Sequence, residues 1–201
     1  MASVLRSEPA VEPEGERELV RLARGGDRDA AAALLQRHEL VAWRVCRSLL
    51  PAGEDVEAAV QETLLRALRG LPGLAADAGF RGWLAAIALN LCRDRLRRRR
   101  LVPFLSLEGG TDDDDAGPVA VLPASGPDPE RATMARQAVA RVRREVARLP
   151  RRQREVFALR FFAELELEAI AGALALDVGT VKTHLHRAVR RVRRVAEEAL
   201  P

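Results

Sequence analysis

Hydrophobic residues recur at three- and four-residue steps along several separate stretches of this chain, which is the period of an amphipathic α-helix. The stretch 16–50 is divided by Gly25 and Gly26 into a short helix and a longer one, and Asp27 is placed to cap the longer helix. Further stretches with the same period are 54–71, 80–100, 130–148 and 151–162. The pattern predicts an all-α fold.

The stretch 165–194 is the most informative, because it predicts two amphipathic helices separated by a tight turn. Ala171 is small enough for the two helices to cross closely, and Val181 is the buried residue that would pack on it. Ala175 occupies the turn position that needs a positive φ, at a cost of about 1 kcal/mol for a residue other than glycine. The two apolar stripes are Leu167, Ile170, Ala171 and Leu174, and then Val178, Val181, Leu185, Ala188, Val192 and Val195. Together these features predict a helix-turn-helix.

The second helix of this motif has a strongly basic polar face. No acidic residue occurs between Val178 and Val195, and Lys182 is the only lysine of the chain. The residues that lie off the apolar stripe are Lys182, Thr183, His186, Arg187, Arg190 and Arg194. Such a face favours phosphates and base edges of DNA. The alternative is a basic amphipathic hairpin that simply packs within a helical protein.

The composition supports helices and limits the possible chemistry. The chain has 201 residues, 48% hydrophobic content, a net charge of +4, few aromatic residues and no tyrosine. Cys46 and Cys92 lie among apolar neighbours, which indicates buried thiols in a reducing cytoplasm rather than a disulfide framework or a zinc site. His184 and His186 do not share a helix face and make a poor metal pair. No catalytic constellation is present, so we expect no enzyme activity, cofactor, metal or small-molecule substrate.

The stretch 80–100 ends in arginines at positions 93, 95, 97, 98, 99 and 100, with Asp94 as the only acidic neighbour in sequence. The helix dipole accounts for one or two such cations at a helix C-terminus, and nucleic acid is a better explanation for six. Segment 101–129 is rich in Pro, Gly and Ser and carries an acidic run, which predicts a flexible linker of roughly 30 Å root-mean-square span.

The linker divides the chain into two small helical domains, 16–100 and 130–201, after a disordered tail over 1–15. The tail has no apolar core, so neither a signal peptide nor a membrane span is expected. The first domain is predicted to have a complete core of its own, centred on Val45, Leu64, Trp83 and Ile87. We therefore expect the domains to fold independently and to meet chiefly through their binding partners.

Two groups of motifs resemble the extracytoplasmic-function (ECF) sigma factors of bacterial RNA polymerase. In the second domain these are LPRRQREVFALRFF, AIAGAL and DVGTVKTHLHRA, and in the first domain VQETLLRAL and FRGWLAAIALNLCRDRLRR. The resemblance implies that domain 16–100 (sigma domain 2) binds the clamp helices of core polymerase and opens the minus-10 element. It implies that domain 130–201 (sigma domain 4) reads the minus-35 element. Glu166 and Ala175 depart from the family pattern, which has a small hydroxyl cap and a glycine there.

The resemblance also assigns roles to individual residues. Asn90 matches an asparagine near the non-template strand, where an amide can pair with an exposed base edge. The backbone of the minus-10 DNA would be held by Arg93, Arg95, Arg97 and Arg98. The major groove at minus-35 would be read by Lys182, Thr183, His186 and Arg187, with Arg190, Arg191 and Arg194 on phosphates. Core polymerase would be contacted by Glu57, Gln61, Glu62 and Arg66.

The partners implied are core RNA polymerase, promoter DNA and an anti-sigma factor, with no membrane. Two other functions remain open from the residues alone. One is a helix-turn-helix regulator that acts without being a polymerase subunit, and the other is an enzyme or scaffold with incidental basic helices. The basic first domain and the long linker favour the sigma factor, because a regulator normally carries an effector-binding or dimerising domain instead.

Overall fold

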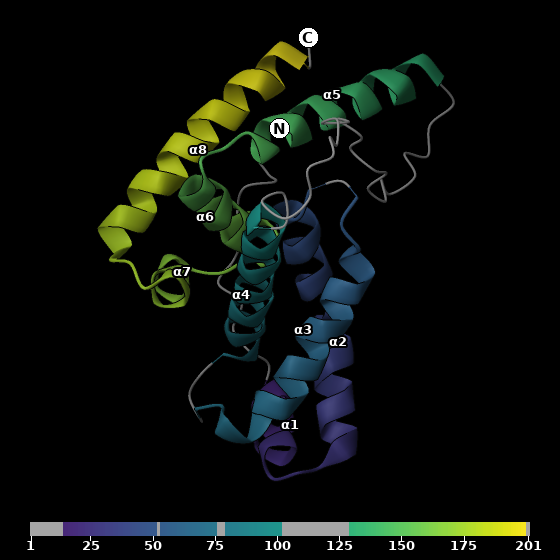
Figure 1. Ribbon diagram of the computed structural model, residues 1–201, viewed down its shortest axis with the longest axis vertical. Helices are drawn as coiled ribbons and strands as arrows, with labels where there is room; N and C mark the ends of the chain where they lie inside the picture. The colour runs from purple at the N-terminus through teal and green to yellow at the C-terminus, as the bar shows by residue number, and fades with distance from the viewer. Residues whose placement is uncertain (1–13, 52, 76–78, 102–128, 200–201) are drawn as a thin grey trace.

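The computed structural model describes residues 14–51, 53–75, 79–101 and 129–199, and these contain only helices and their connections (Figure 1). The predicted all-α fold is confirmed. In chain order the elements are α1 (Glu14–Arg24), α2 (Arg28–Leu49), α3 (Val56–Gly70), the 3-10 helix η1 (Leu71–Gly73), α4 (Phe80–Leu101), α5 (Pro129–Ala147), α6 (Arg151–Phe161), α7 (Leu167–Leu174) and α8 (Val178–Ala199).

Helices α1 to α4 form the first domain, in which α2 packs against α1, α3 and α4. Asp27 caps α2 as predicted, since its carboxylate accepts hydrogen bonds from the backbone N–H groups of Asp29 and Ala30 at 3.0 and 2.9 Å. Asp55 caps α3 in the same way, accepting from Ala58 at 2.8 Å. These caps satisfy backbone donors that the first turn of a helix leaves unpaired, and so they define where the two helices begin.

Helices α5 to α8 form the second domain, in which α8 packs along α5, α6 and α7. Its own apolar cluster is small, with buried residues Val146, Leu149, Phe157, Ala188 and Val192. Figure 1 shows α5 and α8 at one end of the molecule and α1 at the other, while α2 runs from α1 up to α5 and α6, which it contacts.

The two domains are in direct contact, which differs from the expectation that they meet chiefly through partners. Helix α4 contacts α7, and α2 contacts α6. Val156, Leu159 and Ile170 of the second domain belong to the same buried cluster as Val45 and Leu84 of the first. Helix α6 is apolar on two sides, because Val156 faces this shared cluster while Phe157 faces the small cluster of the second domain. The hydrophobic core is therefore continuous across the domain boundary.

The predicted helix boundaries differ from the observed ones by one or two residues, except that α8 continues five residues beyond the predicted stretch 165–194, to Ala199. Helix α4 ends at Leu101 and α5 begins at Pro129, so the predicted linker 101–129 starts and ends inside helices, and its remainder lies outside the described residues. The predicted tail 1–15 is divided likewise. Residues 1–13 lie outside the described residues, and residues 14 and 15 belong to α1, which begins at Glu14. Not every apolar residue of the periodic stretches is buried, since Leu68 and Phe161 have 46% and 36% of their surface exposed.

Candidate nucleic-acid interface

The helix-turn-helix is built from α7, its turn and α8. Ala175 ends α7 in the left-handed conformation, with φ 52° and ψ 51°, which confirms the positive φ expected there. Asp177 opens α8, because its carboxylate accepts from the backbone N–H of Thr180 at 2.8 Å and from the Thr180 hydroxyl at 2.5 Å. These hydrogen bonds lower the pKa of Asp177. Ala171 and Val181 are both buried in the shared core, as the predicted helix crossing requires.

The polar face of α8 is exposed along its whole length. All seven residues proposed for the upstream element are exposed: Lys182, Thr183, His186, Arg187, Arg190, Arg191 and Arg194. Arg191 donates from Nε to the carboxylate of Glu145 on α5, and Thr183 donates to the backbone carbonyl of Gly179 at 3.0 Å. In the described part of the chain, no carboxylate forms an ion pair with Lys182 or Arg187. These two side chains are therefore available to a ligand.

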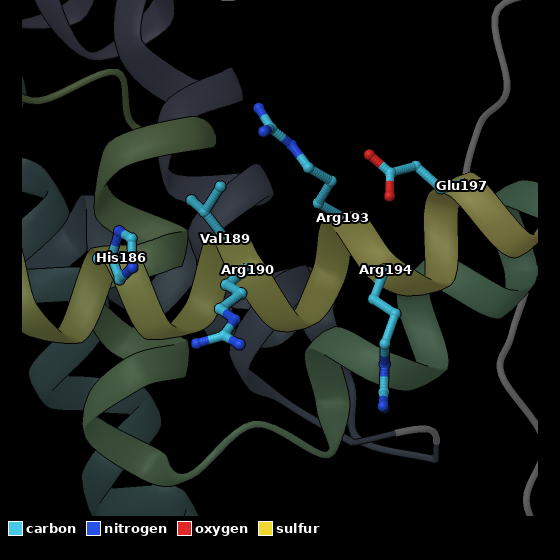
Figure 2. Close-up of a pocket in the computed structure, with 6 residues that line it drawn as sticks. All are labelled: His186, Val189, Arg190, Arg193, Arg194 and Glu197. Carbon is cyan, nitrogen blue, oxygen red and sulfur yellow. The ribbon is translucent and has the colours of Figure 1, made fainter.

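A shallow open groove of about 520 Å³ runs along the C-terminal half of α8. Figure 2 shows the six residues that line it, with Arg190 and Arg194 pointing to one side of the helix and Arg193 to the other. The remaining lining residues are His186, Val189 and Glu197. Because one helix supplies all six, the groove is a surface feature of the exposed basic face rather than a separate cavity.

The arginines at the end of α4 are mostly engaged with carboxylates of other elements. Arg93 donates two hydrogen bonds to Glu155 of α6, at 2.8 and 2.7 Å, and a third to Asn90 Oδ1 at 3.2 Å. Arg95 donates to the backbone carbonyl of Asp55 at 3.1 Å and to Glu62 at 3.3 Å.

Arg97 pairs with Asp94 at 3.2 Å, whereas Asn90 and Arg98 are exposed. Asp94 is therefore the only acidic neighbour of these arginines in sequence but not their only counter-charge in space. Carboxylates distant in sequence face this helix as well, and Glu54 lies 3.8 Å from Arg99. The predicted minus-10 residues do not form one free basic face in this arrangement.

The four residues assigned to polymerase binding lie on α3 but differ in exposure. Glu57 and Gln61 are exposed, while Glu62 and Arg66 are half-buried and form an ion pair at 2.5 Å. Burial alone would raise the pKa of Glu62, but hydrogen bonds from Arg66 and Arg95 outweigh it and the pKa lies below its usual value. The charges of Glu62 and Arg66 are thus largely satisfied within the protein.

Sequence reasoning missed an exposed apolar surface beside these residues. Leu65 on α3 is 51% exposed, and Leu40 on α2 is 54% exposed. Leu68 lies three residues after Leu65 on the same helix and is 46% exposed, so the two form an exposed apolar pair on α3. The one signal in the sequence was the density of leucines in α3, which exceeds what a single buried stripe can take up. Isolated surface leucines are ordinary, but a group next to exposed polar residues is typical of a protein-binding surface.

Cys46 and Cys92 are free thiols and are both buried, as predicted. Among the residues that the structure describes, no group of three or more His, Cys, Asp or Glu side chains could hold a metal ion. In the same part of the chain, no helix is long and apolar enough to cross a membrane.

Comparison with known proteins identifies the family. The family model for Sigma-70 region 2 matches residues 34–102, and the family model for Sigma-70, region 4 matches residues 140–192. The ECF RNA polymerase sigma factor SigM of Mycobacterium tuberculosis is 33% identical over 170 residues, which cover 85% of this chain and 79% of that protein. This chain therefore belongs to the ECF group of the sigma-70 family.

Two solved structures resemble the whole fold. CnrH in complex with the cytosolic domain of CnrY matches with a TM-score of 0.66 and 25% identity, over 92% of this chain and 99% of that chain. The sigma factor RpoE in complex with the anti-sigma factor NepR, from Bartonella quintana, matches with a TM-score of 0.63 over 79% of this chain and 92% of that chain. The second match has 22% identity and is evidence for the fold alone.

Membership in this family establishes the general function. The protein is a transcription initiation factor that binds core RNA polymerase and gives it promoter specificity. Sigma factors are not enzymes, because the polymerase performs the chemistry. The alternative of a regulator that acts without polymerase is not favoured, since both conserved sigma regions match in the expected order.

Proposed function

We propose that α8 reads the upstream promoter element and that the C-terminal half of α4 contacts the downstream element. The observation that carries the proposal is the exposed basic face of α8 on a helix-turn-helix with an intact turn. In such motifs the second helix enters the major groove, with residues of its N-terminal half on base edges. Lys182 and Arg187 are then the base readers, because arginine and lysine pair well with guanine.

Residues further along α8 have a positioning role in this proposal. Arg190 and Arg194 would contact phosphates, which fix the register of the helix but carry no sequence information. Arg191 is held by Glu145, and so it would reach a phosphate only if that ion pair opens or shares its donors. Thr183 and His186 complete the major-groove set as exposed side chains of the same helix turn.

On α4, Asn90 and Arg98 are the residues best placed for the downstream element, since both are exposed. Arg93 and Arg95 would hold the DNA backbone after exchanging their present carboxylate partners for phosphates. For core polymerase, we propose a surface on α3 that combines Glu57 and Gln61 with the exposed Leu65 and Leu68. An apolar centre with a polar rim is the usual composition of a protein interface.

We also propose that an anti-sigma factor restrains the protein and that it acts in the cytoplasm with the polymerase. The supporting observation is the likeness to CnrH, whose structure was obtained with the cytosolic domain of CnrY. That structure aligns with 92% of this chain.

Transcription in vitro tests the role of α8. Lys182→Ala and Arg187→Ala should each weaken recognition of the upstream element by about 1–3 kcal/mol if the lost contact is to a base, and by less if it is to a phosphate. Both variants should lose the preference between promoters with intact and mutated upstream elements, while binding to core polymerase is unchanged.

Arg17→Ala is the matched control, because it removes one exposed positive charge from α1, at the end of the molecule away from α8 (Figure 1). It should leave promoter preference intact. If Lys182→Ala and Arg187→Ala also leave promoter preference and strength intact, α8 is not the reader of the upstream element.

A further inference from the structure

The first helix of the helix-turn-helix, α7, begins differently from the second. Glu166 occupies its N-cap position in an extended conformation, with φ −72° and ψ 160°, but within the described chain its side chain accepts no hydrogen bond from the first turn of α7. At the start of α8, by contrast, the carboxylate of Asp177 accepts from the backbone of Thr180 at 2.8 Å. Because α7 has only eight residues, contacts at its ends have a large share in fixing its position.

Arg160, in the last turn of α6, supplies such a contact. Its Nη1 donates to the backbone carbonyl of Leu165 at 2.8 Å and to the carboxylate of Glu166 at 3.0 Å. The Arg160 side chain is 21% exposed, so solvent competes only partly for these bonds. A hydrogen bond between two charged groups is stronger than one between neutral groups. One guanidinium therefore joins the end of α6 to the two residues that precede α7.

The connection between α6 and α7 is held at a second point as well. The backbone N–H of Leu165 donates to the carbonyl of Leu159 at 3.0 Å, and the Leu165 side chain is buried. Both backbone polar groups of Leu165 are thus paired with residues of α6. Glu164, just before it, has a positive φ of 56°, a conformation that persists only where its surroundings enforce it. The bonds of Arg160 are part of those surroundings.

The position of α7 bears directly on DNA reading. Helix α7 packs against both α6 and α8, and Ala171 of α7 lies in the same buried cluster as Val181 of α8. In a helix-turn-helix the first helix crosses the DNA backbone while the second lies in the major groove. Binding groups must be held within about 0.5 Å of their productive geometry. A shift of α7 against α6 therefore changes how α8 meets the base edges.

We propose that Arg160 is a positioning residue for the upstream element, which holds Leu165 and Glu166 and so fixes α7 and α8 in the orientation that DNA reading requires. The proposal rests on the proposed function, in which α8 is the reader. Glu166, which stands where the family has a small hydroxyl cap, fixes the guanidinium of Arg160 on the Leu165 carbonyl. The competing role for Arg160 is a direct contact to a DNA phosphate.

Transcription with core polymerase separates these two roles, with promoters whose upstream element is intact or mutated. Arg160→Ala should lower the preference for the intact element about tenfold, and Glu166→Ala about threefold, because the Leu165 carbonyl still holds the guanidinium. The double variant should be no worse than Arg160→Ala, because both substitutions break one contact. A direct phosphate contact predicts instead that Glu166→Ala maintains or raises the preference, since it frees Arg160 from a competing carboxylate.

The preference ratio distinguishes orientation from mere stability. A smaller fraction of folded protein lowers transcription from both promoters equally and leaves their ratio unchanged. Glu166→Gln keeps an oxygen acceptor for Arg160 and should retain most of the preference. Glu166 is exposed, so its variants should keep the fold, as circular dichroism verifies, even if Arg160→Ala loses helicity. Arg21→Ala is the matched control, because it breaks an exposed pair with Glu18 within α1, and it should leave the ratio unchanged.

The outcomes separate this proposal from the proposed function. If Lys182→Ala and Arg187→Ala lower the preference while the folded Arg160 and Glu166 variants do not, α8 remains the reader and the positioning role is overturned. An unchanged or raised preference in Glu166→Ala, or losses that add in the double variant, would overturn it as well. If Lys182→Ala and Arg187→Ala have no effect, the proposed function itself fails, and the positioning role fails with it.

Discussion

Glu155 is the residue in which local sequence and tertiary environment conflict most clearly. The segment RRQREV has the composition of a solvated helix start, yet its glutamate is almost completely buried. Burial of a carboxylate is costly unless the charge is paired and hydrogen-bonded, and Arg93, Arg151 and Arg152 provide both. Burial alone would raise the pKa of Glu155, but the hydrogen bonds from Arg93 and Arg151 outweigh it and the pKa is lowered.

This lowered pKa predicts a pH-dependent contribution to stability. A carboxyl whose pKa is lower in the folded than in the unfolded state stabilises the fold above the unfolded value, about 4.3, and loses that contribution as the pH falls through the folded value. At pH 7, Glu155→Gln should lower the free energy of unfolding by about 3 kcal/mol, because three guanidinium groups lose a charged partner. The difference from the parent chain should shrink between about pH 5 and about pH 2.

Urea unfolding over this pH range measures the effect. Glu18→Gln serves as the control, because Glu18 also has a pKa lowered by its hydrogen bond from Arg21 but is fully exposed, so the solvent screens its ion pair. Its curve should follow that of the parent protein. A gap between Glu155→Gln and the parent that is the same at all pH values would mean that Glu155 contributes through packing rather than through its charge.

At the scale of elements, the turn of the helix-turn-helix contains a residue poorly suited to its conformation. Ala175 has φ 52°, where the Cβ atom is crowded and glycine is not. Ala175→Gly should therefore raise the free energy of unfolding by about 1 kcal/mol, which thermal or urea unfolding can measure.

Ala173→Gly, two residues earlier within α7, is the matched substitution at a helical position. It should have the opposite sign and lower stability by about 1 kcal/mol, because glycine is less favourable in a helix. Two substitutions with the same sign would indicate that the positive φ of Ala175 is not strained.

Local signals predicted the helices well because periodicity and caps are contained within a few residues. The αL residue Ala175 and the cap Asp27 were both identified from sequence, each from its position relative to one helix. The two buried faces of α6 were harder to predict, since helical periodicity does not indicate which apolar residue packs against which neighbouring element. Val156 and Phe157 are adjacent apolar residues of one periodic stretch, yet they point into two clusters. Leu68 has the helical spacing of a buried residue but is exposed, because spacing alone cannot limit the width of the buried stripe.

Across the whole molecule, the contacts that sequence could not predict are those between the domains. Arg93 and Glu155 are 62 residues apart, and Arg81 and Glu164 are 83 residues apart. Arg93 and Glu155 lie in charged stretches that local reasoning assigns to DNA or to solvent, and no local signal pairs Arg81 with Glu164. The helix-turn-helix and the exposed basic face of α8 followed from motif and composition, whereas the pairing of arginines with distant carboxylates depends on how the domains dock.

The continuous core predicts cooperative unfolding of the two domains. The second domain has only a small apolar cluster of its own and buries Leu159, Leu165 and Ile170 in the shared core. Its stability should therefore depend on the interface, and the parent chain should unfold in one transition. In the double variant Glu155→Gln/Glu164→Gln, the second domain should unfold before the first. Its melting temperature should fall by about 4–8 °C for each kcal/mol of stability that the interface loses.

Two optical signals distinguish the domains without any label. Both tryptophans of the chain, Trp43 and Trp83, lie in the first domain, so their fluorescence reports α2 and α4, whereas far-ultraviolet circular dichroism reports all helices. Coincident transitions from the two probes are expected for the parent chain, because cooperative unfolding has no populated intermediate. In the double variant the circular dichroism signal should begin to fall at a lower temperature than the fluorescence changes. If the two probes already separate in the parent chain, the domains unfold independently, and the docked arrangement contributes little to stability in solution.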